Sequence, residues 1–174
     1  EAMASLAVHV LMDLLNRAPC EAERACFAPG FTRPVRTIES GAAIGDAHLL
    51  LVTLQFELQY PTLSRMLADS GLPPLGRERS AEHPVVLCGG PAVSANPAPM
   101  AALADLVYVG EIEPRVPDLQ EALARAARAG LSRETLIAEL SCVPGIINCS
   151  DWLAGRTTAA AVQHAADADA YVPH

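Results

Sequence analysis

Three short stretches of the sequence place glycine, hydroxyl, amide and carboxylate groups where an α/β protein could bind a ligand. They are Thr53-Leu54-Gln55, Gly89-Gly90-Pro91 and Gly110-Glu111-Ile112-Glu113, and each follows a short apolar run that is typical of a strand. Open parallel sheets bind ligands at the carboxyl ends of their strands, and a Gly-Gly pair there lets a flat ligand approach the backbone closely. The sequence therefore places the strand ends 53–57, 88–92 and 109–113 on one edge of the predicted sheet, where a flat or bulky ligand could approach the backbone.

The residue types alone leave a plainer interpretation open. Gly-Gly-Pro after a strand is also a common tight turn, and Gly110-Glu111 can be a turn with a solvated acid. The glycine spacing matches neither the GxGxxG of dinucleotide sites nor the GxxxxGK[ST] of nucleotide triphosphate sites, and no GxSxG is present. Glu57, Glu111 and Glu113 are the acid and base candidates of a small enzyme, but the sequence offers no nucleophile to pair with them.

The cysteines predict neither a disulfide framework nor a metal site. Their number is odd, no CxxC occurs, and most lie among apolar neighbours; they are Cys20, Cys26, Cys88, Cys142 and Cys149. This pattern favours reduced thiols that are mostly buried. The spacings also exclude a compact iron–sulfur or zinc motif on this chain.

Composition excludes several classes of partner. The chain has 174 residues, of which 51% are hydrophobic and 18% charged, as suits one compact domain or one domain with an extension. The formal net charge is −8 and the basic residues are scattered, so no stripe of positive charge could follow a nucleic-acid backbone. No apolar run approaches the roughly 20 residues that span a bilayer, and the first residues lack the order of a secretion signal. We expect a soluble, cytoplasmic protein with no nucleic-acid partner and no membrane partner.

Hydrophobic periodicity predicts alternating strands and helices. Continuously apolar runs indicate strands over 48–54, 84–87 and 106–109, the first two buried on both faces of a sheet, with shorter extended pieces over 23–27 and 34–38. Helical spacing and end signals predict helices over 3–17, 60–71, 116–129 and 132–140. A further helix is expected to begin at Asn96-Pro97, with an apolar face formed by Met100, Leu103 and Ala104. Residues 72–83 are polar and proline-containing, and we expect a surface loop there.

This order predicts an α/β fold, namely a flavodoxin-like or Rossmann-like three-layer sandwich with a mostly parallel sheet. Such a domain normally begins with a strand, whereas this chain begins in a helix. We therefore expect the first central strand to lie before residue 1, which would make the chain a fragment of a longer protein. Residues 1–149 form the predicted domain, and the Ala-rich residues 150–174 a C-terminal extension or linker toward a further domain.

Several motifs occur in one order along the chain: Glu39-Ser40-Gly41, Phe56-Glu57-Leu58, Gly89-Gly90-Pro91, Asn96-Pro97 and Gly110-Glu111. In this order they resemble the N-terminal, cobalamin-binding-like domain of radical S-adenosylmethionine (radical SAM) proteins, especially an uncharacterised subgroup of Fe–S oxidoreductases. The resemblance covers about residues 3 to 128. It implies that the strand-end loops face a cobalamin.

The resemblance also implies that each loop contacts a different part of the cofactor. Thr53, Leu54 and Gln55 take the place of the loop on the lower-ligand side of the corrin, and Gly89, Gly90 and Pro91 that of the loop beside the nucleotide tail. Gly110, Glu111 and Glu113 match the last strand-end loop, so the resemblance implies that these nine residues form the cofactor-binding site. Asp46-Ala47-His48 begins a DxHxxG cobalt-ligand motif, but residue 51 is leucine and His48 leads into a strand instead of following one. A cobalamin bound here would therefore be base-off and His-off.

The resemblance places the radical chemistry elsewhere. The CxxxCxxC motif that holds the 4Fe–4S cluster of radical SAM enzymes is absent, so this chain alone cannot cleave S-adenosylmethionine. Cluster and S-adenosylmethionine would belong to a radical SAM barrel domain or subunit, the expected partner. Three functions stay open: a cobalamin-binding module, a scaffold or docking domain of the same fold without cobalamin, and a small flavodoxin-like enzyme. Phe56 and Tyr60 could either line the floor of the corrin site or fill it.

Overall fold

A four-stranded sheet forms the centre of the molecule. The computed structural model describes residues 6–16, 20–27 and 34–157. Its sheet contains β1 (Leu49–Thr53), β2 (Val85–Gly89), β3 (Leu106–Tyr108) and β4 (Ile146–Asn148) in that spatial order. β1, β2 and β3 run parallel, and β4 pairs antiparallel with β3. The predicted α/β fold with a mostly parallel, flavodoxin-like or Rossmann-like sheet is confirmed.

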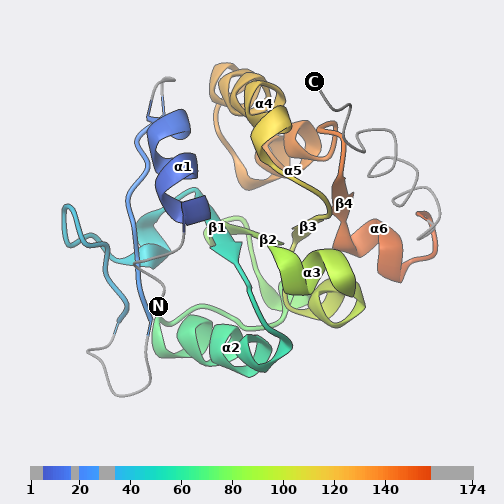
Figure 1. Ribbon diagram of the computed structural model, residues 1–174, viewed down its shortest axis with the longest axis horizontal. Coiled ribbons are helices and arrows are strands. Elements are labelled where there is room, and N and C mark those ends of the chain that lie inside the picture. Colours follow the sequence, from blue (N-terminus) through green and yellow to red (C-terminus); the bar gives the residue numbers. More distant parts are fainter. Residues whose placement is uncertain (1–5, 17–19, 28–33, 158–174) are drawn as a thin grey trace.

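Helices cover both faces of the sheet. In Figure 1, α2 (Tyr60–Asp69) and α3 (Pro91–Ala95) lie on one side, and α1 (Leu6–Leu15), α4 (Val116–Arg128) and α5 (Arg133–Leu140) on the other. β2 is buried on both sides, because Val86 and Cys88 pack into the core beneath α2 and α3 whereas Val85 and Leu87 pack beneath α4 and α5. This is why a continuously apolar run marks a central parallel strand.

The helices predicted from periodicity and end signals are confirmed. The expected helices over 3–17, 60–71, 116–129 and 132–140 correspond to α1, α2, α4 and α5 within the described residues. α4 buries residues spaced three or four apart, which are Val116, Leu119, Ala122 and Ala126. The Ser132 side chain accepts a hydrogen bond from the backbone N–H of Thr135 at 3.2 Å and so caps α5 as its position predicts.

The short strand predicted over 23–27 is wrong. Only Ala25 pairs in this segment, through one antiparallel bridge to Thr37, and Arg36 forms a similar single bridge to Ala43 within the predicted piece over 34–38. Side chains replace a strand ladder here: the Arg24 backbone N–H and Nε both donate to the Glu39 carboxylate, each at 2.7 Å. Both segments lie mostly at the surface, where an apolar core does not enforce strand pairing.

β1 lies where predicted, but its predicted burial on both faces is wrong. It is an edge strand of the described sheet, and Leu51 in its centre is 38% exposed. An apolar run does not distinguish an edge strand from a central one. The strand expected before residue 1 stays a prediction.

One strand and two α-helices were not predicted from the sequence. β4 has three residues, and α3 and α6 (Cys149–Leu153) have five each, lengths at which periodicity carries almost no signal. Trp152 of α6 packs against the core, so the described beginning of the predicted extension lies on the domain. The helix expected after Asn96 is a 3₁₀ helix over Ala98–Ala102, although its predicted apolar residues Met100 and Ala104 are buried.

Arg79 in the segment 72–83 belongs to the most deeply buried ion pair among the described residues. The prediction that this segment is a simple surface loop is therefore wrong. The side chain of Arg79 is 0% exposed and donates to Asp105 Oδ2 at 2.9 Å. Arg79 also donates to the carbonyl oxygens of Pro73, Pro74 and Leu103. The guanidinium therefore fastens this segment to the start of β3.

Asp105 is the centre of this polar cluster. Its Oδ2 also accepts the backbone N–H of Val86 at 2.8 Å, and its Oδ1 accepts from Arg133 of α5 at 2.6 Å. Arg133 in turn donates to the carbonyl oxygen of Pro84 at 2.7 Å. Because a buried carboxylate needs such partners, the cluster ties β2, β3 and α5 together at the amino end of the strands.

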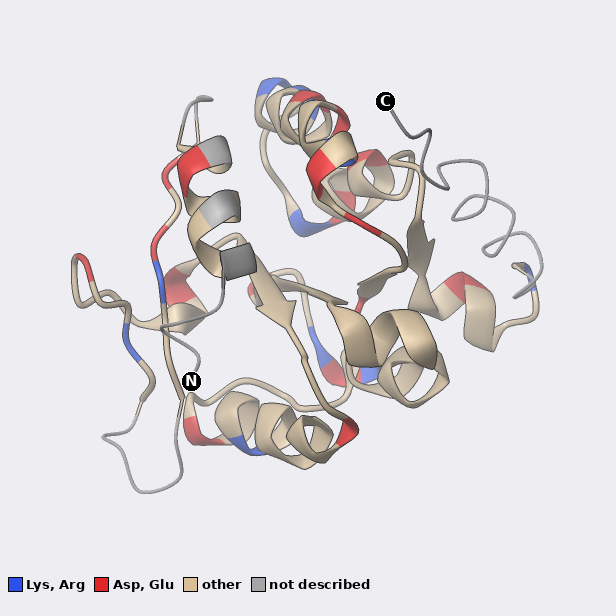
Figure 2. Cartoon of the chain, in the orientation of Figure 1, with Lys and Arg blue, Asp and Glu red and all other residues tan. Residues whose placement is uncertain are grey.

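The surface carries both signs of charge. Arginines and acidic residues are interspersed over the helices, in keeping with the predicted lack of a basic stripe (Figure 2). On α4 and α5 they form ion pairs, for example Arg125 with Glu139 at 2.6 Å. Within the described residues, no helix has the length and apolarity needed to cross a bilayer.

Candidate functional site

The nine predicted site residues lie in the loops at the carboxyl edge of the parallel strands. Thr53 at the end of β1 stands in register with Gly89 at the end of β2. The third loop joins them through α3, because Ser94 Oγ accepts the backbone N–H of Gly110 at 3.2 Å. We call this set of loops, residues 53–59, 89–92 and 109–113, the strand-end edge. The structure therefore brings together segments that are far apart in the sequence.

The first two loops bond directly to each other. The Leu54 backbone N–H donates to the Gly89 carbonyl oxygen at 2.9 Å, and the Ala92 N–H donates to the Leu54 carbonyl oxygen at 3.2 Å. Gly90 has φ of +99°, and a Cβ there would lie 2.7 Å from the Leu54 oxygen and 2.9 Å from Thr53 Oγ1. The glycine is thus needed for the approach of the chain's own backbone, and the space beside its Cα is filled.

The side chains of the first loop bond within the loop. Gln55 Nε2 donates to Thr53 Oγ1 at 3.2 Å. The Gln59 side-chain oxygen accepts the backbone N–H groups of Gln55 at 2.6 Å and of Phe56 at 3.3 Å. The side chains of Thr53 and Gln55, which were expected to face a ligand, therefore bond to each other, and Gln59 fixes the shape of residues 55–59.

The third loop presents two acids to solvent. Gly110 has φ of +121°, a conformation that favours glycine, and Glu111 and Glu113 are exposed. The Tyr108 hydroxyl donates to the Glu111 carbonyl oxygen at 2.6 Å, which holds the start of the loop against β3. Glu57 in the first loop is exposed as well.

Phe56 and Tyr60, whose roles the sequence left open, differ in the structure. The Tyr60 hydroxyl donates to the Ala92 carbonyl oxygen at 3.1 Å, and the ring packs against the core, so Tyr60 fills space between α2 and α3. Phe56 is 65% exposed, and its neighbour Leu58 is 88% exposed. The strand-end edge thus displays two large apolar side chains on a loop of fixed shape.

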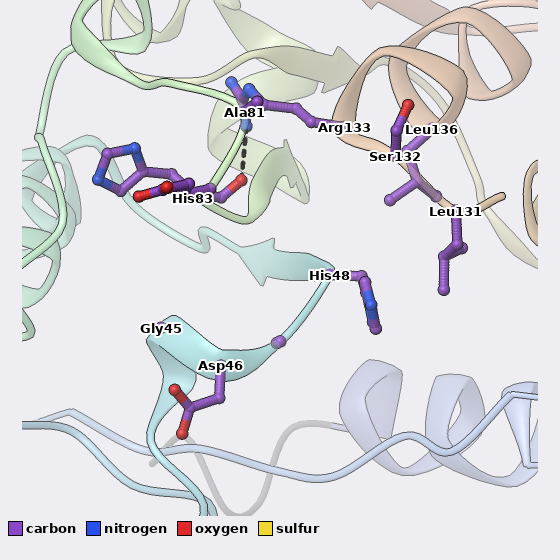
Figure 3. Close-up of a pocket in the computed structure, with 11 residues that line it drawn as sticks. Gly45, Asp46, His48, Ala81, His83, Leu131, Ser132, Arg133 and Leu136 are labelled. Carbon is purple, nitrogen blue, oxygen red and sulfur yellow. Dashed lines mark hydrogen bonds between the residues drawn. The ribbon is translucent and has the colours of Figure 1, made fainter.

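A cavity of about 390 Å³ lies at the opposite edge of the sheet, where sequence reasoning placed no site. It is lined by residues 45–48, residues 81–83 and the start of α5. Figure 3 shows that Asp46, His48 and His83 point in different directions, and that Arg133 is held by the carbonyl oxygen of His83. His48 lies at the amino end of β1, as expected for a residue that leads into a strand. These side chains do not converge on one point where a ligand or metal could be bound.

The five cysteines are all free, as predicted, but the prediction that most of them are buried is wrong. Cys88 and Cys149 are buried, Cys20 and Cys26 are half-buried, and Cys142 is exposed. Burial raises the pKa of the Cys149 thiol to about 12 and also raises the pKa of the Cys88 thiol, so both are protonated at neutral pH. Among the described residues, no three His, Cys, Asp or Glu side chains form a group that could hold a metal ion.

Fold and site together define an α/β module with an open sheet whose strand-end loops are joined to one another. Comparison with protein families matches residues 8–147 to a family described as radical SAM proteins, N-terminal. The chain therefore belongs to this family of N-terminal regions of radical SAM proteins. The match begins within α1 and ends within β4, and so covers all of the sheet except Asn148. No curated protein and no solved structure matches the chain.

Proposed function

We propose that this chain is a non-catalytic positioning module of a radical SAM protein, and that it uses the strand-end edge to hold a catalytic domain in place. The observation that carries the proposal is the family match over residues 8–147. It is supported by the absence of a metal-binding group among the described residues and of a CxxxCxxC motif from the sequence. The 4Fe–4S cluster and S-adenosylmethionine would belong to the catalytic domain, which supplies the radical chemistry.

The finer alternative is that the module holds a cobalamin at the same edge, as the resemblance implies. A corrin needs a wide, open floor, but the bonds between Leu54, Gly89 and Ala92 close the first two loops onto each other. Thr53 and Gln55 bond to each other, and the space beside Gly90 is filled. The described residues therefore do not form a cradle for a corrin, and the geometry favours the docking function.

The small-enzyme alternative has no support in the geometry of the glutamates. Glu57, Glu111 and Glu113 are all exposed to water, which is not the environment that tunes a catalytic acid or base. We therefore assign these three glutamates no catalytic role.

A comparison of the isolated chain with the complete radical SAM protein tests the proposed function. Both would be reconstituted with iron and sulfide without oxygen, and their bound iron and the release of 5′-deoxyadenosine from S-adenosylmethionine would be measured. We expect both signals from the complete protein and neither from the isolated chain. A stoichiometric cluster and S-adenosylmethionine cleavage in the isolated chain would overturn the proposal.

Gel filtration with hydroxocobalamin and methylcobalamin distinguishes docking from cobalamin binding. We expect no colour to travel with the folded chain at micromolar concentration. Co-elution with a base-off absorption spectrum would instead establish the cobalamin module.

A further inference from the structure

The loop Gln55–Gln59 is an apolar projection on the strand-end edge. Among the described large apolar residues, the three most exposed are Leu58 at 88%, Leu153 of α6 at 68% and Phe56 at 65%. Exposing both costs hydrophobic free energy, and paired exposed apolar residues mark interaction sites more often than single ones do. The loop therefore has the composition of an anchor for a partner.

The fold fixes the shape of this loop before any partner binds. Gln59 accepts two backbone N–H groups at the beginning of the loop, and the Gln59 N–H donates to the Phe56 carbonyl oxygen at 3.0 Å. α2 follows directly at Tyr60, whose hydroxyl is bonded to the neighbouring loop. An anchor that is already ordered loses less conformational entropy on binding than a flexible one.

The strand-end edge carries negative charge in the projection and in the loop after β3. Glu57 lies between Phe56 and Leu58, and the exposed Glu111 and Glu113 follow β3 on the same edge. The next cation along the chain, Arg115, is paired with Asp118 at 3.3 Å. A surface that complements this edge would have an apolar socket with a basic rim.

We propose that Phe56 and Leu58 anchor this module in an apolar, Arg- or Lys-rimmed socket on the radical SAM catalytic domain of the same protein. This inference rests on the proposed function, because the family match makes a radical SAM domain the partner. Phe56 and Leu58 supply the buried apolar contact, and the three glutamates set the orientation through charge.

Photo-crosslinking in the complete protein tests the inference. The photoreactive residue p-benzoylphenylalanine would replace Phe56 in one variant and Leu153 in a matched control. Leu153 is 68% exposed, and its helix begins at the opposite edge of the sheet, since Asn148 at the end of β4 pairs with Leu106 at the start of β3. We expect crosslinks from position 56 to apolar peptides of the catalytic domain that contain Arg or Lys, at a yield at least about tenfold above position 153.

Three other outcomes would overturn the inference: crosslinks from position 56 only to a second copy of the protein, crosslinks only within residues 1–174, or equal yields from both positions.

The double variant Phe56→Ser with Leu58→Ser provides a second readout. We expect it to expose residues 109–113 to proteolysis at least about tenfold faster in the complete protein, with cluster content unchanged. Unchanged proteolysis would contradict the inference. A cluster in the isolated chain would instead refute the proposed function, so the two failures are distinguishable.

Discussion

Gly90 shows most directly how a single residue holds the strand-end edge together. Its φ is +99°, and an added Cβ would meet the backbone of Leu54 at 2.7 Å. We expect Gly90→Ala to lower the free energy of unfolding by about 3 kcal/mol or more, because strained backbone and steric overlap add. Gly71→Ala is the control, since Gly71 has φ of +76° with no atom within 4 Å, and its cost should be about 1 kcal/mol. Equal losses in urea unfolding would show that the contact with Leu54 does not matter.

Asp105 makes a second prediction at the same scale. Asp105→Asn removes the charge that balances Arg79 and Arg133, whose side chains are 0% and 9% exposed. An uncompensated buried charge costs about 3–5 kcal/mol, and we expect a loss of this size in chemical denaturation. Glu139→Gln breaks an ion pair with Arg125 that is 30–39% exposed, and should cost less than about 1 kcal/mol. Similar losses for the two variants would contradict the role of the buried cluster.

The buried thiols predict how stability responds to alkaline pH. Their pKa values are raised in the folded state, to about 12 for Cys149, whereas the unfolded thiols ionise near the ordinary value of 9. The folded protein therefore binds more protons above pH 9, so this contribution to stability is intact below that pH and is lost as the pH rises above it. We expect the free energy of unfolding to fall by about 1.4 kcal/mol per pH unit for each thiol.

Cys149→Ala tests this origin. The variant should have a shallower decline of stability between pH 9 and 11 than the parent, in denaturation curves measured at each pH. The chain contains no lysine, and the other cysteines and the three tyrosines are present in both proteins, so the difference between the two slopes reports on Cys149. An unchanged slope would mean that Cys149 is already accessible in the folded protein.

At the scale of the elements, the predictable helices were those with a periodic signal longer than about two helical turns, and the predictable strands were those marked by a continuous apolar run. α4 shows this, because Leu119, Ala122 and Ala126 fall on one face and all are buried. β4 and α6 lack that length, and the single bridges of Ala25 and Arg36 depend on side chains distant in sequence. The position of β1 at the edge follows from topology, which its own apolar residues do not encode.

α2 provides the test of this element-level account. Leu67 is 0% exposed and lies four residues after the buried Leu63, so Leu67→Ala should cost about 2–5 kcal/mol in thermal or chemical unfolding. Leu58→Ala, in the loop before the same helix, should change stability by less than about 0.5 kcal/mol. If both variants lost equal stability, Leu58 would be buried in solution and the projecting loop would not exist.

At the scale of the whole molecule, the sequence predicted where the loops meet, but not what they do there. Parallel strands bring residues 53–55, 89–91 and 110–113 to one edge in any open α/β sheet, and this placement is observed. The bonds from Leu54 to Gly89 and Ala92, and from Gln59 to its own loop, depend on rotamers and loop conformations that no local pattern encodes. The same holds for Arg79. Its neighbours in the sequence predict an exposed charge, and only the folded chain places Asp105 beside it.

The central claim is that the strand-end edge, and not the cavity at the opposite edge, faces the catalytic domain. Hydrogen–deuterium exchange of the isolated chain and of the complete radical SAM protein measures this most directly. The account predicts that residues 55–59 and 109–113 become protected in the complete protein, while residues 45–48 and 81–83 exchange equally in both. Protection of residues 45–48 and 81–83 with no change at the strand-end edge would contradict it.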